Sequence, residues 1–432
     1  ADLWKIFEEY NTLFKNQSGS AIHSKILNSA MFSMKENEEW RFLNFFENWN
    51  PENFIESDWK EIVKEDKVYP PLAIKALKKA FEQIKLGNQF NDSTKIITAY
   101  KTALVKFPKD IWLKREYAIL LAKNNESEEA IKIYKNLVLE LGDQSYTWHE
   151  FALLFSEEEL DLPIGMLSKA IKLQKDENFL GSTRLDLADK LIKKNKLEEA
   201  LVELNKYQEY RIANNKNLSD KFNELKVLVK EVQTHKKDNL ELYDEYIIVS
   251  ENFAYQDILW TELVFIEKWK NDKNKEKLSF TDGHNMSLSI NANRFQILKN
   301  IEVGQVVRFK LHNKLVEDKI KLHHFKQEYY PLLAEISDKP KWSCLEDTIA
   351  VVDYINVEKN IVHAISSDNK EVFFPKEKLS LNKGDFIRAK KLQKKVREEI
   401  RIDLKDITKV TKEEVINNFN SHSAVIESIN AD

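Results

Sequence analysis

The sequence predicts a multidomain α + β protein, with an α-helical solenoid in the first half and small β domains in the second. Three observations predict this class. Small and apolar residues recur with a period of about 34 residues, the pattern changes to alternating apolar and polar residues after about position 240, and 432 residues are long for one domain. We therefore expect two to four domains.

The helical half is predicted from three sets of small and apolar residues. Ala118 and Ala130 are separated by the same step as Ala188 and Ala200. The sets are Ala118, Leu121, Ala130, Tyr134 and Leu137; Ala152, Phe155, Pro163, Leu167 and Ala170; and Ala188, Leu191, Ala200, Leu204 and Tyr207. They resemble the tetratricopeptide repeat, a helical hairpin whose small residues let its two helices touch closely. The resemblance implies a solenoid over residues 91–240, and an ordinary helical bundle is the alternative.

The resemblance also implies a protein-binding groove. In this repeat family the ligand-facing residues come mainly from the first helix of each hairpin. Here that helix offers Trp112, Arg115, Ile119, Tyr146, His149 and Leu153, and further along Leu185, Asp189 and Lys193. The lysine and asparagine clamp by which some members grip a C-terminal carboxylate is not found. The mixture of aromatic, apolar and few charged groups favours an amphipathic peptide or helix as the partner.

Residues 1–90 are expected to be helical and are rich in aromatic side chains. One short stretch contains Trp40, Phe42, Phe45, Phe46, Trp49, Phe54 and Trp59. The end of a solenoid must cover its open face, so we interpret this region as a packed cap. A partner-binding groove is the alternative.

The second half is predicted to consist of short strands separated by Asn, Asp, Gly and Lys turns. The strand-like runs are TELVFIEKW, KLSFT, MSLSINA, QVVRFKLH, TIAVVDYIN, NIVHAIS and EVFFP. The segment around Gly304 matches the segment around Gly384, so we expect two related β domains, residues 241–335 and 336–412. The run AVIESIN from Ala424 matches AVVDYIN from Ala350, which predicts that residues 413–432 begin a further unit of a longer protein.

The second β domain resembles a cold-shock or S1-like domain, a five-stranded barrel of the OB type. The resemblance covers AVVDYINVEKNIVHAISSDNKEVFFPKEKLSLNKGDFIRAK. In that family, strand aromatics stack on nucleobases. The resemblance places Tyr354, His363 and Phe373 at stacking positions and Lys359 at the turn lysine. The sequence departs from the family at three positions: Asn360 replaces a glycine, Ile361 an aromatic residue and Pro375 a histidine. The alternative to base stacking is that Phe373 or Phe374 fills the barrel interior.

The charge distribution gives mixed evidence on whether the protein binds nucleic acid. The 67 Lys and Arg residues are outnumbered by 71 Asp and Glu residues, whereas a nonspecific nucleic-acid binder is usually basic. A local basic run contains Arg388, Lys390, Lys391, Lys394 and Lys395, followed by Arg397 and Arg401. These side chains are candidates for contacting a phosphate backbone beside the stacking face. A solvated linker or helix is the alternative interpretation.

Residues typical of catalysis or metal binding are few. The sequence contains no phosphate-binding loop, nucleophile elbow, zinc-protease motif or dinucleotide-binding loop. His312, His323 and His324, with Glu317 and Asp318 between them, fit no defined metal site. The single cysteine, Cys344, cannot form an internal disulfide, which favours a reducing cytosol, and we expect it to be buried. No apolar run approaches the length of a membrane span.

These observations predict a non-enzymatic adaptor without cofactor or metal. We expect the solenoid to bind a protein or peptide and the OB-like barrels to bind RNA or single-stranded DNA. The alternative is a pure protein-interaction scaffold, and an enzyme would need catalytic residues from elsewhere. Richness in Lys, Asn and Ile is typical of an AT-rich bacterial genome, and such fusions fit bacterial RNA regulation or phage defence. The identity of the partner and the oligomeric state stay open.

Overall fold

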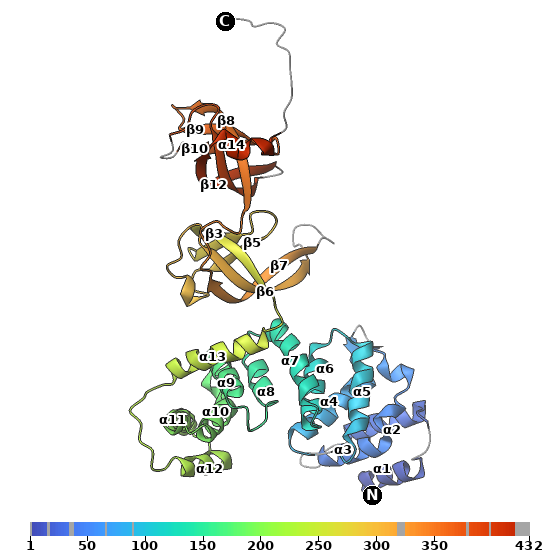
Figure 1. Cartoon of the computed structure of the whole chain (residues 1–432). Helices are drawn as coiled ribbons and strands as arrows, with labels where there is room; N and C mark the ends of the chain where they lie inside the picture. The colour runs from blue at the N-terminus through green and yellow to red at the C-terminus, as the bar shows by residue number, and fades with distance from the viewer. Residues whose placement is uncertain are drawn as a thin grey trace, which may run out of the picture. The chain divides into compact units, whose positions relative to one another are not determined.

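The computed structural model describes residues 2–14, 18–33, 39–64, 67–88, 90–317, 325–376, 380–396 and 399–419. The chain forms two compact units, Ala1–Ala254 and Tyr255–Asp432. In the described residues the first unit is helical apart from one short hairpin, and the second consists mainly of two antiparallel sheets (Figure 1). The predicted fold class, an α-solenoid followed by tandem small β-barrels, is confirmed.

The first unit opens with a cap of short helices around an aromatic core. Asp2 and Ser20 accept backbone N–H groups at the starts of its first two helices, which satisfies donors that have no partner inside a helix. Phe42, Phe46 and Trp49 are fully buried, whereas Trp40 is exposed. The elements are α1 Leu3–Leu13, α2 Ala21–Phe32, α3 Glu39–Trp49, η1 Pro51–Asn53, η2 Glu56–Trp59, β1 Ile62–Lys64, β2 Lys67–Tyr69 and α4 Leu72–Lys85.

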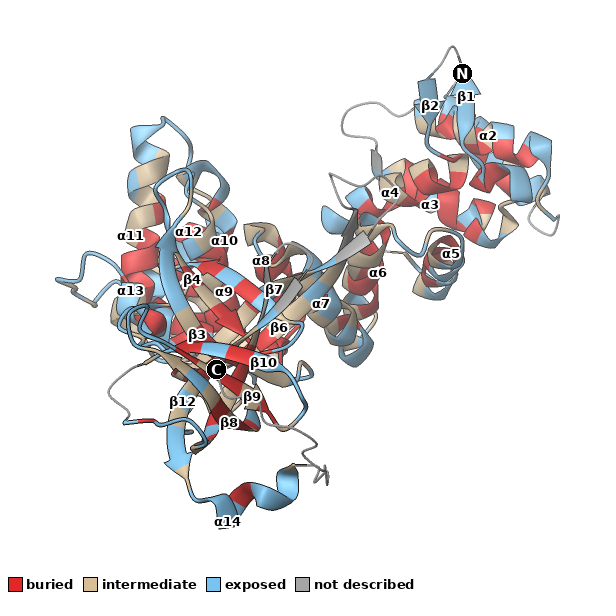
Figure 2. Cartoon of the chain, turned by 90° about the horizontal axis from the view of Figure 1, so that it is seen from above, coloured by how far each residue is buried: buried red, intermediate tan, exposed pale blue. Residues whose placement is uncertain are grey.

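Successive helical hairpins follow the cap. They are built from α5 Ser93–Lys106, α6 Ile111–Lys123, α7 Ser127–Leu141, α8 Ser145–Ala152, α9 Asp161–Leu173, α10 Gly181–Lys193 and α11 Leu197–Ala213, with the short η3 Glu177–Phe179 before α10. Ala118 and Ala130 are fully buried where α6 packs on α7, and Ala188 and Ala200 are fully buried where α10 packs on α11. The close approach predicted from the alanine spacing is therefore confirmed. Figure 2 shows buried residues in red along these helices and exposed residues in pale blue on β1 and β2.

Three of these helices end in the same way, with an asparagine in the left-handed region. Asn125, Asn195 and Asn215 have φ values of 62°, 60° and 52°. The next N–H then bonds to a carbonyl in the last helical turn: Glu126 to Leu121 at 2.9 Å, Lys196 to Leu191 at 2.8 Å and Lys216 to Arg211 at 2.8 Å. Asparagine tolerates this conformation better than most side chains, so the turn ends each helix sharply.

The change from helix to strand comes later than about residue 240, where the sequence suggested it. After α12 Asp220–Leu228 the chain forms α13 Leu240–Ala254, which packs on α9. Tyr243, Ile247 and Ser250 recur at helical spacing and are buried, so this apolar run follows a helical period although its residue types suit strands. The contact with α9 is close because residue 165 is glycine: an added Cβ atom would lie 2.0 Å from the carbonyl oxygen of Tyr246.

The second unit contains two five-stranded sheets of the same topology. The first has the order β5-β4-β3-β6-β7 and the second the order β10-β9-β8-β11-β12. The strands are β3 Trp260–Lys270, β4 Glu276–Thr281, β5 Ser287–Asn291, β6 Val306–Glu317 and β7 Phe325–Ile336, then β8 Glu346–Asn356, β9 Ile361–Ser366, β10 Glu371–Pro375, β11 Phe386–Val396 and β12 Glu399–Val410. The second sheet curls until β10 contacts β12, whereas in the first η4 Gln296–Leu298 lies against β7.

The predicted match between the segments around Gly304 and Gly384 is also structural. Both glycines have positive φ, 91° and 88°, and each lies just before the fourth strand of its sheet. The N–H of Gly304 bonds to the carbonyl of Phe265 at 2.8 Å, and that of Gly384 bonds to Val352 at 2.7 Å. The same turn thus fixes the first strand against the fourth in both barrels.

The last described residues form short helical turns, α14 Lys412–Val415 and η5 Ile416–Asn418. The segment AVIESIN, for which the sequence predicts the first strand of another unit, lies outside the described residues. Among the helices that the structure describes, no helix is long and apolar enough to cross a membrane.

Candidate binding surfaces

Three rings form a row across neighbouring strands of the second barrel. Tyr354 on β8 pairs in register with His363 on β9, and His363 pairs with Phe373 on β10. Tyr354 is 57 % exposed and Phe373 is 56 % exposed. We call Tyr354, His363 and Phe373 the aromatic row, and the structure brings these predicted residues together on the outer face of the barrel.

A β-bulge points Tyr354 outward. Val352 is buried in the barrel core, and strict alternation would place Tyr354 on the same inner face. The register between β8 and β9 shifts between Val352 and Tyr354, which moves the tyrosine to the outside. On β10, Phe374 is buried and its neighbour Phe373 is exposed. The alternative in which Phe373 fills the interior is therefore wrong, and Phe374 has that role.

His363 is held between an acidic group and a ring. Its Nδ1 atom lies 3.1 Å from Oδ2 of Asp353, and its ring centroid lies 4.7 Å from that of Phe373 with the planes at 35°. Oε2 of Glu371 lies 4.0 Å from Nε2. The aromatic row thus has two carboxylates beside it, which oppose the approach of a phosphate.

Two lysines lie in and next to the turn that joins β8 to β9, a few residues along the strands from the row. Lys359 is in the turn between β8 and β9, and it is exposed. The N–H of Lys376, just after β10, bonds to the carbonyl of Asn360 in the same turn at 3.0 Å. Lys376 therefore joins the predicted Lys359 beside the row, a neighbour that the sequence-based reasoning missed because only strand pairing reveals it.

The basic run of β11 is placed elsewhere. Lys390 pairs with Asp347 at 3.0 Å, and the buried Lys391 pairs with Asp368 at 2.9 Å. In the strand register, Lys390 lies opposite Asp347 and Lys391 opposite Glu346 on β8. These two β8 residues are seven and eight positions from Tyr354, about 23 Å along the strand. Arg388 is exposed, but its neighbour on β8 is Ile349. The backbones of Lys394 and Lys395 lie in β11, and their side chains lie outside the described part of the structure.

The first barrel has no such row at the equivalent positions. Strand pairing places Glu267, Ser279 and Ser289 where the second barrel has its three rings. An exposed aromatic residue, Trp269, lies nearby and donates its indole N–H to the hydroxyl of Ser279 at 2.8 Å. The two barrels share a fold but present different surfaces, and at these equivalent positions the three rings belong to the second barrel.

In the helical unit, three predicted groove residues form a stack. The rings of Trp112 on α6 and Tyr146 on α8 are 6.0 Å apart, and the guanidinium of Arg115 lies 5.3 Å and 4.9 Å from their centroids. Arg115 also forms a two-pronged ion pair with Glu150. Burial opposes the charged form of Arg115, but Glu150 outweighs it and raises the pKa of the guanidinium. Trp112 is 47 % exposed, so the stack forms part of the surface.

The remaining predicted groove residues differ in accessibility. His149 is mostly buried, and its Nε2 atom lies 2.6 Å from Oδ2 of Asp186 on α10. Burial raises the pKa of Asp186, but hydrogen bonds from His149 and Lys221 outweigh burial and lower it. Leu153, just after α8, is 55 % exposed, and Ile119 is half-buried. His149 therefore connects two hairpins, while Leu153 is open to a partner.

The acidic partners in the hairpins are residues that the sequence-based reasoning missed. The hydroxyl of Tyr100 donates to Glu116 at 2.9 Å, and that of Tyr134 donates to Glu150 at 3.1 Å. Both the tyrosine and the glutamate of the second pair lie 34 residues after those of the first pair. Extending the search for the 34-residue repeat to polar residues would therefore have identified these pairs. Each bond ties the second helix of one hairpin to the first helix of the next.

In the described part of the chain, the residues considered for catalysis or metal binding do not form a cluster. Cys344 is partly buried, and burial raises the pKa of its thiol to about 11. Its thiolate is therefore scarce near neutral pH. His312 lies on β6, whereas His323, His324, Asp318 and the side chain of Glu317 lie outside the described residues. Within the described ranges, no three His, Cys, Asp or Glu side chains gather around a metal-sized site.

Comparison with known proteins adds a family match within the helical unit. A family described as "Domain of unknown function (DUF7017)" matches residues 111–247, from the first residue of α6 into α13. No curated protein matches the chain. One solved structure, described as "MamA RS-1 ArsTM double mutant", is similar at 14 % sequence identity and a TM-score of 0.32, covering 45 % of this chain and 97 % of that chain.

Proposed function

We propose that this chain is a non-enzymatic adaptor that binds a protein through its helical unit and RNA or single-stranded DNA through the second barrel. The observation that carries the proposal is the aromatic row. Its rings lie in register on three adjacent strands, and the two outer rings are more than half exposed. A base offers a flat face to any such ring, which suits binding with little sequence preference.

The charges around the row define what kind of binder this is. Asp353 and Glu371 lie beside His363, and the basic side chains of Lys390 and Lys391 are paired some distance away. Lys359 and Lys376 leave about two phosphate contacts, which corresponds to a slope of about 1.4 in log Kd against log salt for a single strand. Stacking therefore supplies most of the affinity.

The protein-binding role is supported by the exposed stack on the first helices of two hairpins. Trp112 and Tyr146 present aromatic surface, Leu153 is exposed just after α8, and Glu150 holds the guanidinium of Arg115 close to both rings. Rigid aromatic side chains bury a large area at a small cost in side-chain entropy, so they are frequent at the centres of interfaces. An amphipathic helix of a partner protein fits this combination.

A pure protein-interaction scaffold is the second candidate, and a specific observation favours it. The carboxylates of Asp353 and Glu371 beside the aromatic row repel phosphates, and they suit a basic protein partner equally well. In this alternative the row binds a protein side chain in place of a base.

Fluorescence anisotropy with short RNA and DNA oligomers, at two salt concentrations, tests the proposal. Tyr354→Ala and Phe373→Ala should each weaken binding by about 1–3 kcal/mol. The matched control is Trp269→Ala, which removes an exposed ring from the first barrel and should leave binding unchanged. Absence of binding by the intact chain at low salt would reject base stacking and leave the scaffold, and an equal loss in the Trp269 variant would show that binding is not specific to the aromatic row.

A further inference from the structure

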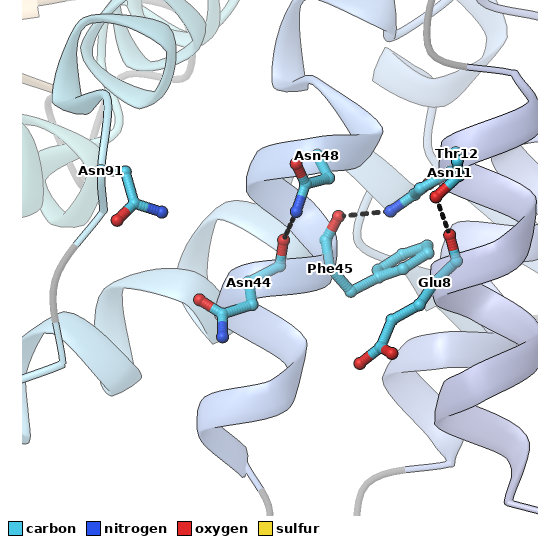
Figure 3. A pocket seen from close by; sticks show the side chains of 7 residues that line it. All are labelled: Glu8, Asn11, Thr12, Asn44, Phe45, Asn48 and Asn91. Carbon is cyan, nitrogen blue, oxygen red and sulfur yellow. Dashed lines mark hydrogen bonds between the residues drawn. The ribbon is translucent and has the colours of Figure 1, made fainter.

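A polar pocket lies in the cap, between α1, α3 and the loop before α5. Its volume is about 570 Å³, and Glu8, Asn11 and Thr12 of α1 line it together with Asn44, Asn48 and Asn91. Figure 3 shows the amides of Asn44, Asn48 and Asn91 around one side of this space and the Glu8 carboxylate on the other. No local sequence pattern predicts this pocket, because its residues come from three separate segments.

Hydrogen bonds within the protein occupy some of the donors of these side chains. Asn11 donates its amide to the carbonyl of Phe45 at 3.0 Å, and Asn48 donates to the carbonyl of Asn44 at 2.9 Å. The hydroxyl of Thr12 donates to the carbonyl of Glu8 at 2.9 Å. The amides of Asn11, Asn48 and Asn91 keep one further N–H each and Asn44 keeps two, whereas each amide oxygen keeps two acceptor sites and the Glu8 carboxylate adds more. Acceptors are therefore in excess in the pocket.

One carboxylate in the lining, Glu8, and one behind the lining residue Asn91, Glu47, add negative charge to this excess. Glu47 on α3 is buried, and its carboxylate accepts the backbone N–H and side-chain amide of Asn91 and the N–H of Asp92, at 3.1, 3.0 and 2.8 Å. These bonds hold Asn91 in the wall of the pocket. No described cation forms an ion pair with Glu47 or Glu8. The Glu47 charge is stabilised by these three N–H groups, and the exposed Glu8 is the carboxylate that lines the pocket, so Glu8 is the negative charge that a positive ligand would meet.

We propose that this pocket binds an arginine or lysine side chain of a partner protein. The ligand must be a cation with several N–H donors, because the pocket offers acceptors and negative charge. Guanidinium meets both conditions best, since its five N–H groups can reach several oxygen atoms at once, whereas ammonium has three donors. The proposal is independent of the aromatic row and of any nucleic acid.

Calorimetric titration of the intact chain with Nα-acetyl-arginine amide tests the proposal. The matched ligand is Nα-acetyl-citrulline amide, which has a similar shape and a neutral urea group in place of guanidinium. We expect the arginine ligand to bind at least ten times more tightly than the citrulline ligand. In the Glu8→Gln variant its affinity should fall about five-fold or more, and in the control Glu9→Gln, one residue along the same exposed helix, it should not change.

The other outcomes decide against the proposal. Equal binding of the two ligands, or equal losses in the Glu8 and Glu9 variants, would show that the pocket does not select a cation. Tighter binding of free arginine than of the capped ligand would assign the pocket to a small metabolite. If no heat of binding is measured with the ligand at millimolar concentration and in 20-fold excess over the protein, the proposed site is wrong. The melting temperatures of the variants must match that of the parent chain for the comparison to hold.

Discussion

At the scale of single residues, Asp368 shows how the second barrel uses Lys391, for which the sequence predicts a phosphate contact. Asp368 lies in the turn between β9 and β10 and pairs with the buried Lys391 of β11. Burial raises the pKa of Asp368, but the hydroxyl of Ser366 and the ammonium of Lys391 outweigh burial and lower it to about 2. Lys391 therefore stabilises the barrel and is not free to bind phosphate.

This pairing predicts a defined pH dependence. The pKa of Asp368 is lower in the folded chain than its ordinary value of 3.8, so the paired form stabilises the fold above about pH 4, and this stabilisation is lost as the pH falls towards 2. Asp368→Asn should lower the melting temperature at pH 7, and the difference from the parent chain should shrink between pH 4 and 2. Asp272→Asn, in an exposed loop, is the control; a difference that is constant with pH would contradict the pairing.

At the scale of elements, α13 depends on one glycine. A Cβ atom at Gly165 would lie 2.0 Å from the carbonyl oxygen of Tyr246 and 2.1 Å from the hydroxyl oxygen of Ser250. That hydroxyl donates to the carbonyl of Leu162 at 2.7 Å, so an added methyl group would separate α9 from α13 and break this bond.

We therefore expect Gly165→Ala to destabilise the helical unit by about 3 kcal/mol, at the upper end of the cost of overpacking a core. Urea unfolding followed by circular dichroism measures the loss. Gly181→Ala is the matched control, because its Cβ atom would meet the nearest atom of Tyr207 at 3.4 Å, an ordinary contact. A Gly165 variant as stable as the control would argue against the close packing of α13.

The sequence predicts helices and strands better than it predicts which way their side chains face and which elements they contact. Ala118 and Ala130 revealed a hairpin because helix contacts impose a local spacing on small residues. The sequence predicts that the β half begins near the run containing Tyr243 and Ile247, because the residue types of this run suit both helix and strand. The outward position of Tyr354 came from a family resemblance, because alternation alone would have turned it inward. The bulge that exposes it depends on pairing with β9, which no local pattern encodes.

At the scale of the whole molecule, the two compact units should unfold separately. Each has its own buried core, and the division falls between Ala254 and Tyr255. We expect calorimetry of the intact chain to show more than one transition, and chains 1–254 and 255–432 to fold alone with melting temperatures close to those transitions. A single two-state transition of the intact chain, or an unfolded fragment, would show that the units stabilise each other.

If the aromatic row binds a nucleic acid, as we propose, its width limits how many bases it can hold. Three rings on three adjacent strands offer places for at most three bases, and the outer strands are about 10 Å apart. At about 1–3 kcal/mol per base, such a short footprint gives a fast-dissociating complex. In the proposed adaptor, residence time would come from the helical unit. Once that unit held a partner carrying the nucleic acid, the row would meet the strand at the effective concentration set by the tether.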